Sequence, residues 1–150
     1  MKKKWTWIIL WTSLVMVFMV GIVQKTPIER VVYQFERDQA KLEKLARLAV
    51  AQRNLEGVEA PDGWTEVSLY NAGNDWITVE FQYGSFGIAP SGTYWGVNYV
   101  PSDQMLGFQG VQGEYWKQVD DGRLYYEPES DNTCYVQRLA PCWYLYEAKF

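Results

Sequence analysis

The chain divides into three stretches with different hydrophobic patterns. The first, residues 5–23, has no charged side chain and follows Lys2, Lys3 and Lys4. A helix rises ~1.5 Å per residue, so these 19 residues would span roughly 28 Å, close to the ~30 Å hydrocarbon core of a bilayer. We therefore predict a transmembrane helix at 5–23 behind a cytoplasmic tail at 1–4, because lysine clusters tend to stay inside.

A cleaved signal peptide is the alternative for this stretch. Signal peptides have apolar regions of ~7–15 residues and end in a small-x-small cleavage site. The run here is longer, and Met19-Val20-Gly21 fits such a site poorly. We favour an uncleaved signal-anchor. The chain would then be a single-pass plasma-membrane protein with its N-terminus in the cytoplasm and its C-terminal domain outside.

The second stretch, residues 24–57, has the period of an amphipathic helix. Thr26, Pro27 and Glu29 suit a helix start, because threonine caps, proline fits the first turn and the glutamate completes a capping box. We expect this helix to end near Asn54 and to pack on a sheet, with a stalk or a coiled-coil dimer as alternatives. Its apolar stripe is Ile28, Val31, Val32, Phe35, Leu42, Leu45, Leu48 and Ala49.

The third stretch, residues 58–150, alternates polar and apolar positions, which indicates short strands joined by turns. The predicted strands are 65–69, 77–83, 93–100, 105–109, 114–119, 123–127, 133–138 and 143–149. Short connections between them favour antiparallel neighbours. The predicted fold class is α+β: the transmembrane helix, one long amphipathic helix, and an antiparallel meander of about seven strands, curled or closed into a small barrel. An all-β barrel or sandwich with the helix outside is the alternative.

Charge narrows the choice of partners for this β domain. Twelve acidic residues and only four basic residues follow Ala60, within a net charge of −4 for the whole chain. Such a domain repels phosphate backbones, so we expect no nucleic-acid partner. The chain also has no histidine, which removes the commonest transition-metal ligand and the side chain that titrates nearest neutrality.

The two cysteines, Cys134 and Cys142, are candidates for a disulfide. An even cysteine count outside the cytoplasm favours a bridge, although two unpaired thiols are the plainer alternative. Zinc is not expected, because a structural zinc site needs four ligands and the chain offers only two cysteines and no histidine. The spacing is not the Cys-x-x-Cys of a redox centre.

Carboxylates are the remaining candidates for chemistry. Glu127, Glu129 and Asp131 alternate along a loop, where a solvated turn is commoner than a calcium site, so no metal or cofactor is expected. Four other glutamates lie in aromatic-rich strands, and their plainer role is the outward face of a sheet. They are Glu66, Glu80, Glu114 and Glu147. No serine motif, phosphate-binding glycine loop or Cys/His pair accompanies them, so we do not expect an enzyme.

Aromatic residues are abundant and often adjacent in the β domain. Neighbours on a strand point to opposite faces, so a pair such as Trp143 and Tyr144 cannot place both rings in one core. Exposed aromatic rows stack on sugars or anchor protein partners. We select Trp95, Trp116, Trp143 and Tyr144 as candidate ligand-binding residues, against the alternative that both faces of the sheet are covered.

A family resemblance adds a cellular setting but no activity. The ending Trp143-Tyr144-Leu145-Tyr146-Glu147-Ala148-Lys149-Phe150, together with Gly107-Phe108-Gln109-Gly110, resembles a pattern in uncharacterised small single-span membrane proteins of Gram-positive bacteria. The resemblance covers most of the chain, including the anchor. It implies a bacterial envelope protein.

Two functional hypotheses follow from the sequence. The first is a non-enzymatic binding or assembly module, membrane-anchored and extracytoplasmic, for a protein partner or an envelope polymer. The second is a carboxylate-based hydrolase acting on envelope glycan. Two inward carboxylates about 5–10 Å apart in a cleft would favour the hydrolase, whereas a filled core with a flat aromatic patch would favour binding.

Overall fold

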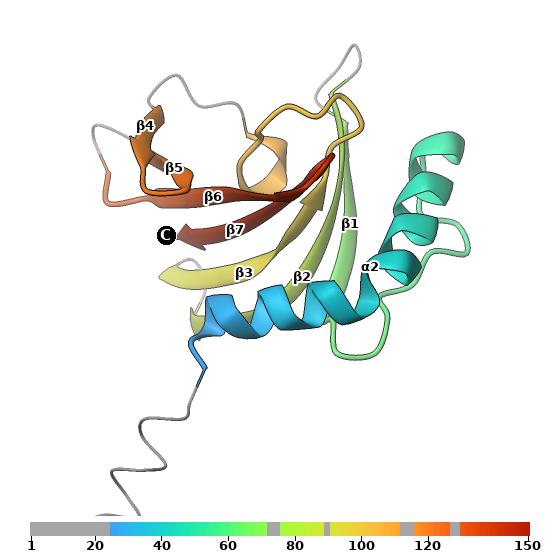
Figure 1. Cartoon of the computed structure of the whole chain (residues 1–150), viewed down its shortest axis with the longest axis horizontal. Coiled ribbons are helices and arrows are strands. Elements are labelled where there is room, and N and C mark those ends of the chain that lie inside the picture. Colours follow the sequence, from blue (N-terminus) through green and yellow to red (C-terminus); the bar gives the residue numbers. More distant parts are fainter. Residues whose placement is uncertain (1–24, 72–75, 89–90, 112–115, 127–129) are drawn as a thin grey trace, which may run out of the picture.

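One helix and a seven-stranded antiparallel sheet make up the computed structural model, which describes residues 25–71, 76–88, 91–111, 116–126 and 130–150 (Figure 1). The predicted α+β class and antiparallel pairing are confirmed. The sheet is open, with β1 and β4 at its two edges, so it is not a closed barrel. Within the described ranges no helix is long and apolar enough to cross a bilayer. The predicted span at 5–23 lies outside those ranges.

The helix α2 (Pro27–Gln52) begins where the sequence predicts. The Thr26 N–H donates to Glu29 Oε2 at 2.6 Å, and the Glu29 N–H donates to Thr26 Oγ1 at 3.2 Å, which completes the capping box. These bonds satisfy amide groups that have no partner inside the helix. The helix ends at Arg53, which adopts the left-handed conformation, slightly before the predicted end.

The apolar face of α2 packs on the sheet, so the helix is not a free stalk over these residues (Figure 1). Its buried apolar residues are Val31, Phe35, Leu42, Ala46 and Ala49, and they meet Val79, Phe81, Val97, Tyr99, Trp143 and Leu145 of the sheet. Burying each large side chain contributes about 1.5–3 kcal/mol, so this interface forms the main core of the fold. Leu48, predicted for the same stripe, is instead exposed.

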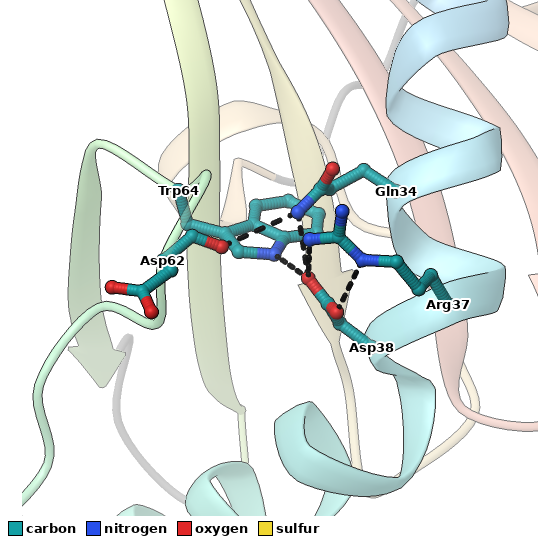
Figure 2. Close-up of polar contacts among 5 residues, drawn as sticks. All are labelled: Gln34, Arg37, Asp38, Asp62 and Trp64. Carbon is teal, nitrogen blue, oxygen red and sulfur yellow. Dashed lines mark hydrogen bonds and ion pairs between the residues drawn. The ribbon is translucent and has the colours of Figure 1, made fainter.

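Polar contacts complete the interface where Asp38 interrupts the apolar stripe (Figure 2). Asp38 Oδ2 accepts from the Trp64 indole N–H at 3.1 Å and from Gln34 Nε2 at 2.7 Å. Gln34 Nε2 also donates to the Asp62 carbonyl at 3.3 Å. The Arg37 guanidinium, bound to the same carboxylate, holds the pKa of Asp38 below its usual value. The cluster fixes α2 to the segment that leads into β1.

Two antiparallel ladders meet at the centre of the sheet. The first contains β1 (Glu66–Asn71), β2 (Ile77–Ile88) and β3 (Ser91–Tyr99). The second contains β4 (Trp116–Val119), β5 (Gly122–Tyr126), β6 (Thr133–Ala140) and β7 (Trp143–Lys149). The C-terminal strand β7 pairs with both β6 and β3, which gives the order β1-β2-β3-β7-β6-β5-β4. The predicted meander is therefore wrong at one place. After β3 the chain crosses to the far edge of the sheet to begin β4, and β7 then returns to pair with β3.

The crossing segment also corrects a predicted strand. Residues 105–109 do not join the sheet, and the short 3-10 helix η1 (Phe108–Gly110) lies on the face opposite α2. Asn98 Nδ2 donates to the Gly107 carbonyl at 3.1 Å, and Gln109 adopts a positive φ of 57°. These features turn the chain back onto the sheet, whereas an extended strand would have led it away from the sheet. η1 helps to cover a second, smaller core formed by Val100, Leu106, Cys134, Val136, Tyr144, Tyr146 and Ala148.

Candidate functional site

A cleft opens on the face of the sheet away from α2. Its volume is about 370 Å³, and its lining is Glu66, Ser68, Tyr70, Glu80, Gln82, Tyr94, Phe108, Gln109 and Phe150. Alternate residues of β1 and β2 supply the floor, since Ser68 pairs with Glu80 and Glu66 with Gln82. Residues paired across antiparallel strands point to the same face, so the polar floor follows from the strand register.

Glu80 is the most unusual residue in this cleft. Only 3% of its surface is exposed, and the described structure places no cation beside it. Burial raises the pKa of Glu80 to about 7, although the Gln109 backbone N–H, which donates to Oε2 at 2.9 Å, and the nearby Tyr146 hydroxyl act in the opposite direction. The carboxyl is therefore close to half protonated at neutral pH.

Three further polar atoms near Glu80 are buried without a hydrogen-bond partner among the described residues. They are Thr78 Oγ1, Asn98 Oδ1 and the Tyr146 hydroxyl oxygen. Thr78 precedes Glu80 by two positions on β2, and Asn98 pairs with Glu80 across the ladder. The Tyr146 hydroxyl is close enough to affect the carboxyl but does not meet hydrogen-bond geometry, and the buried position raises its pKa well above the usual value. Buried polar groups of this kind normally bind water or a ligand.

Aromatic rings form one wall of the cleft. Tyr94 stacks on Phe108 with ring centroids 5.3 Å apart and an interplanar angle of 26°. Phe150 meets Phe108 at 5.5 Å and Tyr94 at 5.9 Å. The C-terminal residue is held there because the backbones of Phe150 and Gly92 exchange two hydrogen bonds. The cleft thus combines a carboxyl, hydroxyl and amide floor with an aromatic wall.

A smaller apolar hollow of about 90 Å³ adjoins the main cleft. It shares Phe108, Gln109 and Phe150 with the main cleft and adds Trp116, Tyr125 and Cys134 to its lining. The rings of Trp116 and Tyr125 meet there at 5.7 Å. The two hollows are therefore neighbouring compartments with opposite polarity.

The four predicted ligand-binding residues do not form one site. Trp143 and Tyr144 are buried, Trp143 in the core under α2 and Tyr144 in the smaller core, because adjacent strand residues face opposite sides. Trp95 packs against the core under α2 and donates its indole N–H to Glu147 Oε2 at 2.9 Å. Of the four, only Trp116 lines a described hollow.

The predicted disulfide does not form in this fold, and both cysteines are free thiols. Cys134 pairs with Ala148 towards one end of β6, whereas Cys142 lies in the turn after Ala140 at the other end. Six strand residues at ~3.3 Å each separate Cys134 from Ala140 by about 20 Å, and a disulfide needs Cα atoms ~4.4–6.8 Å apart. Burial raises the pKa of Cys134 to about 12, which makes it a poor nucleophile.

The glutamates that the sequence analysis considered lie in different environments in the structure. Glu80 is buried and Glu66 lies at the cleft rim, although both were expected on an outward face. Glu147 accepts from Trp95 and pairs with Lys149. Glu114, Glu127 and Glu129 lie outside the described residues. Among the described residues, no group of three or more acidic or cysteine side chains is arranged to hold a metal ion.

The site was only partly visible in the sequence. Thr78, Glu80 and Gln82 alternate along the cleanest predicted strand, which signals one polar face. The return of η1 over that face is a long-range contact without a local signature. No protein-family model, curated protein or solved structure matches the chain.

Proposed function

We propose that this chain is a membrane-anchored, extracytoplasmic binding module whose ligand is a hydroxyl-rich polymer of the bacterial envelope. The observation that carries the proposal is the cleft beside Glu80, with its polar floor and aromatic wall. The uncharged run at 5–23 supplies the anchor in this proposal, and the acidic domain beyond it is the part that meets the ligand.

The chemistry of the lining suits a glycan better than a peptide strand or an anion. Carboxyl, amide and hydroxyl groups of Glu66, Gln82 and Ser68 can accept and donate hydrogen bonds to sugar hydroxyls. The faces of Tyr94 and Phe150 offer apolar surface to the C–H side of a sugar ring. Two carboxyl groups without a lining cation disfavour a phosphate or sulfate ligand.

Hydrolysis of the same polymer is the second candidate, and one observation favours it. Glu66 and Glu80 are diagonal neighbours in the β1–β2 ladder, a relation that separates their Cα atoms by about 7–8 Å and lets the two carboxyl groups face the same cleft. Two carboxyl groups at roughly 6.5–9.5 Å suit an inverting glycosidase, and a raised pKa suits its general acid. Binding ranks first because Glu80 is almost completely buried beneath Gln109 and has little access to a glycosidic oxygen.

Binding to envelope glycan by the full chain in nanodiscs tests the proposal. We expect capture by the wild type and roughly tenfold weaker binding by Glu66→Gln, since a hydrogen bond to a charged group contributes about 1.5–3 kcal/mol. Glu36→Gln is the matched control, because Glu36 is equally charged and exposed but lies on α2. Absence of glycan binding, or equal loss in both variants, would contradict the proposal.

The same experiment separates the two candidates if soluble products are analysed by chromatography. New reducing ends that disappear in both Glu80→Gln and Glu66→Gln would favour the hydrolase. Bound but unshortened glycan is the result expected for a binding module. Selective capture of a protein instead of glycan would place the ligand in another class and reject the polymer.

A further inference from the structure

The β2–β3 hairpin carries the most exposed apolar surface of the described residues. Phe86 is 79% exposed and Ile88 is 87% exposed, more than any other large hydrophobic side chain described. The two residues stand two positions apart on β2, so their side chains share one face. They pair with Thr93 and Ser91 of β3.

The surroundings of these side chains are also free of charge in the sequence. There is no acidic or basic residue between Glu80 and Asp103, although the domain as a whole is strongly acidic. In the fold, Lys149 of β7 pairs with Thr93, so a basic side chain borders the hairpin. An exposed apolar pair on an otherwise acidic domain marks a candidate contact surface. It indicates a contact with an apolar environment.

The position of the hairpin suggests which environment this is. Trp64 contacts both Asp38 of α2 and Tyr83 of β2, so these two residues lie at the same level of the fold. From there, β2 continues five residues to Ile88, or about 17 Å, and α2 runs back eleven residues to Pro27, also about 17 Å. Figure 1 shows the hairpin end and the first turn of α2 at the same end of the molecule.

Lys25 and Thr26, which precede α2, therefore lie at the hairpin end of the domain. Lys25 is the first described residue, and the uncharged run ends only two residues before it, at Val23. We propose that Phe86 and Ile88 insert into the interface of the lipid bilayer next to the anchor. This inference rests on the anchoring proposed above, and it assigns the bilayer as the second contact of the domain.

Tethering explains how so small an apolar surface could be effective. Two side chains bind a bilayer weakly on their own, but an anchor a few residues away keeps them at a high effective concentration near it. The acidic domain is repelled by anionic lipid, whereas Lys25 and Arg30 at the start of α2 are attracted to it. The hairpin and the anchor would together fix the orientation of the domain, and with it the direction in which the Glu80 cleft opens.

Photocrosslinking tests this inference in the full chain. p-Benzoylphenylalanine would replace Phe86 in one variant and Leu48 in a control, with both proteins in nanodiscs of phosphatidylethanolamine and phosphatidylglycerol. Leu48 is exposed but lies 21 residues along α2 from Pro27, near the other end of the helix and away from the proposed membrane side. After irradiation, mass spectrometry would count lipid adducts.

We expect lipid adducts several-fold more abundant at position 86 than at position 48. Equal adducts at the two positions, or no lipid adduct at position 86 in a protein that resists extraction from the membrane by alkaline carbonate, would overturn the inference and leave the anchor intact. A protein that carbonate extracts would instead reject the anchoring itself, and the hairpin inference with it.

Discussion

Glu80 shows how one buried side chain ties stability to pH. Its pKa is about 7 in the fold, against 4.5 for an exposed glutamate, so the folded state binds more protons than the unfolded state between these values. The free energy of unfolding should therefore fall as pH rises through that window and level off above it. Glu29, Asp38 and Asp103 have lowered pKa values, so they lose their contributions only under more acidic conditions.

The substitution Glu80→Gln should remove this pH dependence, because glutamine mimics the protonated carboxyl. Between pH 5 and pH 8 the wild type should lose about 2–3 kcal/mol relative to the variant, because most of the interval between the pKa of 4.5 and the pKa of about 7 lies inside this range and each pH unit there contributes ~1.36 kcal/mol. Urea denaturation at several pH values measures the difference. Parallel pH profiles for the two proteins would mean that Glu80 is not buried as described.

Asp38 gives a second prediction at the residue scale. Removing its carboxylate by Asp38→Ala leaves the Trp64 indole N–H and the Gln34 amide without their acceptor (Figure 2). An unsatisfied, partly buried donor costs about 1–3 kcal/mol, so urea unfolding should show a loss of that size. Glu36→Ala, on the exposed side of the same helix, should change stability by less than about 0.5 kcal/mol. Equal effects would contradict the assigned role of Asp38.

Among the elements, β3 depends on close backbone packing at one glycine. A Cβ at Gly96 would lie 2.3 Å from the Phe81 carbonyl oxygen and 2.6 Å from the Tyr146 hydroxyl, whereas a Cβ at Gly84 would meet nothing within 4 Å. We expect Gly96→Ala to destabilise the fold by at least about 1–3 kcal/mol through overpacking. Gly84→Ala should be close to neutral. Thermal unfolding measures the stability of both variants. Equal midpoint temperatures for the two variants would contradict the close packing described at Gly96.

The helix and most strands could be predicted because their signals are local. The capping box at Thr26 and Glu29 fixes the start of α2, and alternation along Ile77–Tyr83 marks β2. Residues 105–109 misled the prediction, since Met105 and Phe108 look like strand residues but pack under a turn. That turn depends on Asn98 and Glu80, which are distant in the sequence. The polar floor of the cleft was signalled by the alternation along β2, but its closure by η1 could not be predicted for the same reason.

At the scale of the whole molecule, the orientation of the domain relative to the membrane can be tested directly. A Glu36→Cys variant in a Cys142→Ala background should react with a membrane-impermeant maleimide in intact cells, since Glu36 is exposed on α2. Lys3→Cys in the same background should react only after lysis, because the tail is predicted to be cytoplasmic. The reverse pattern would invert the proposed topology.

The position of β7 makes the fold depend on its last residues. This strand joins the two ladders, and Phe150 both pairs with Gly92 and forms part of the aromatic wall. The cleft consequently combines distant parts of the chain, with its floor from β1 and β2 and its wall from β3, η1 and Phe150. Ligand binding should therefore change the environment of residues that are distant in sequence but adjacent in the fold.

Nuclear magnetic resonance of the full chain in nanodiscs tests this central claim most directly. On titration with envelope glycan, the backbone amides of Gln109, Glu66 and Tyr94 should shift together, because all three residues line the cleft. The amide of Glu36 on α2 should not move. Shifts confined to α2, or an unchanged Gln109 amide at saturating glycan, would contradict the assignment of the Glu80 cleft as the ligand site.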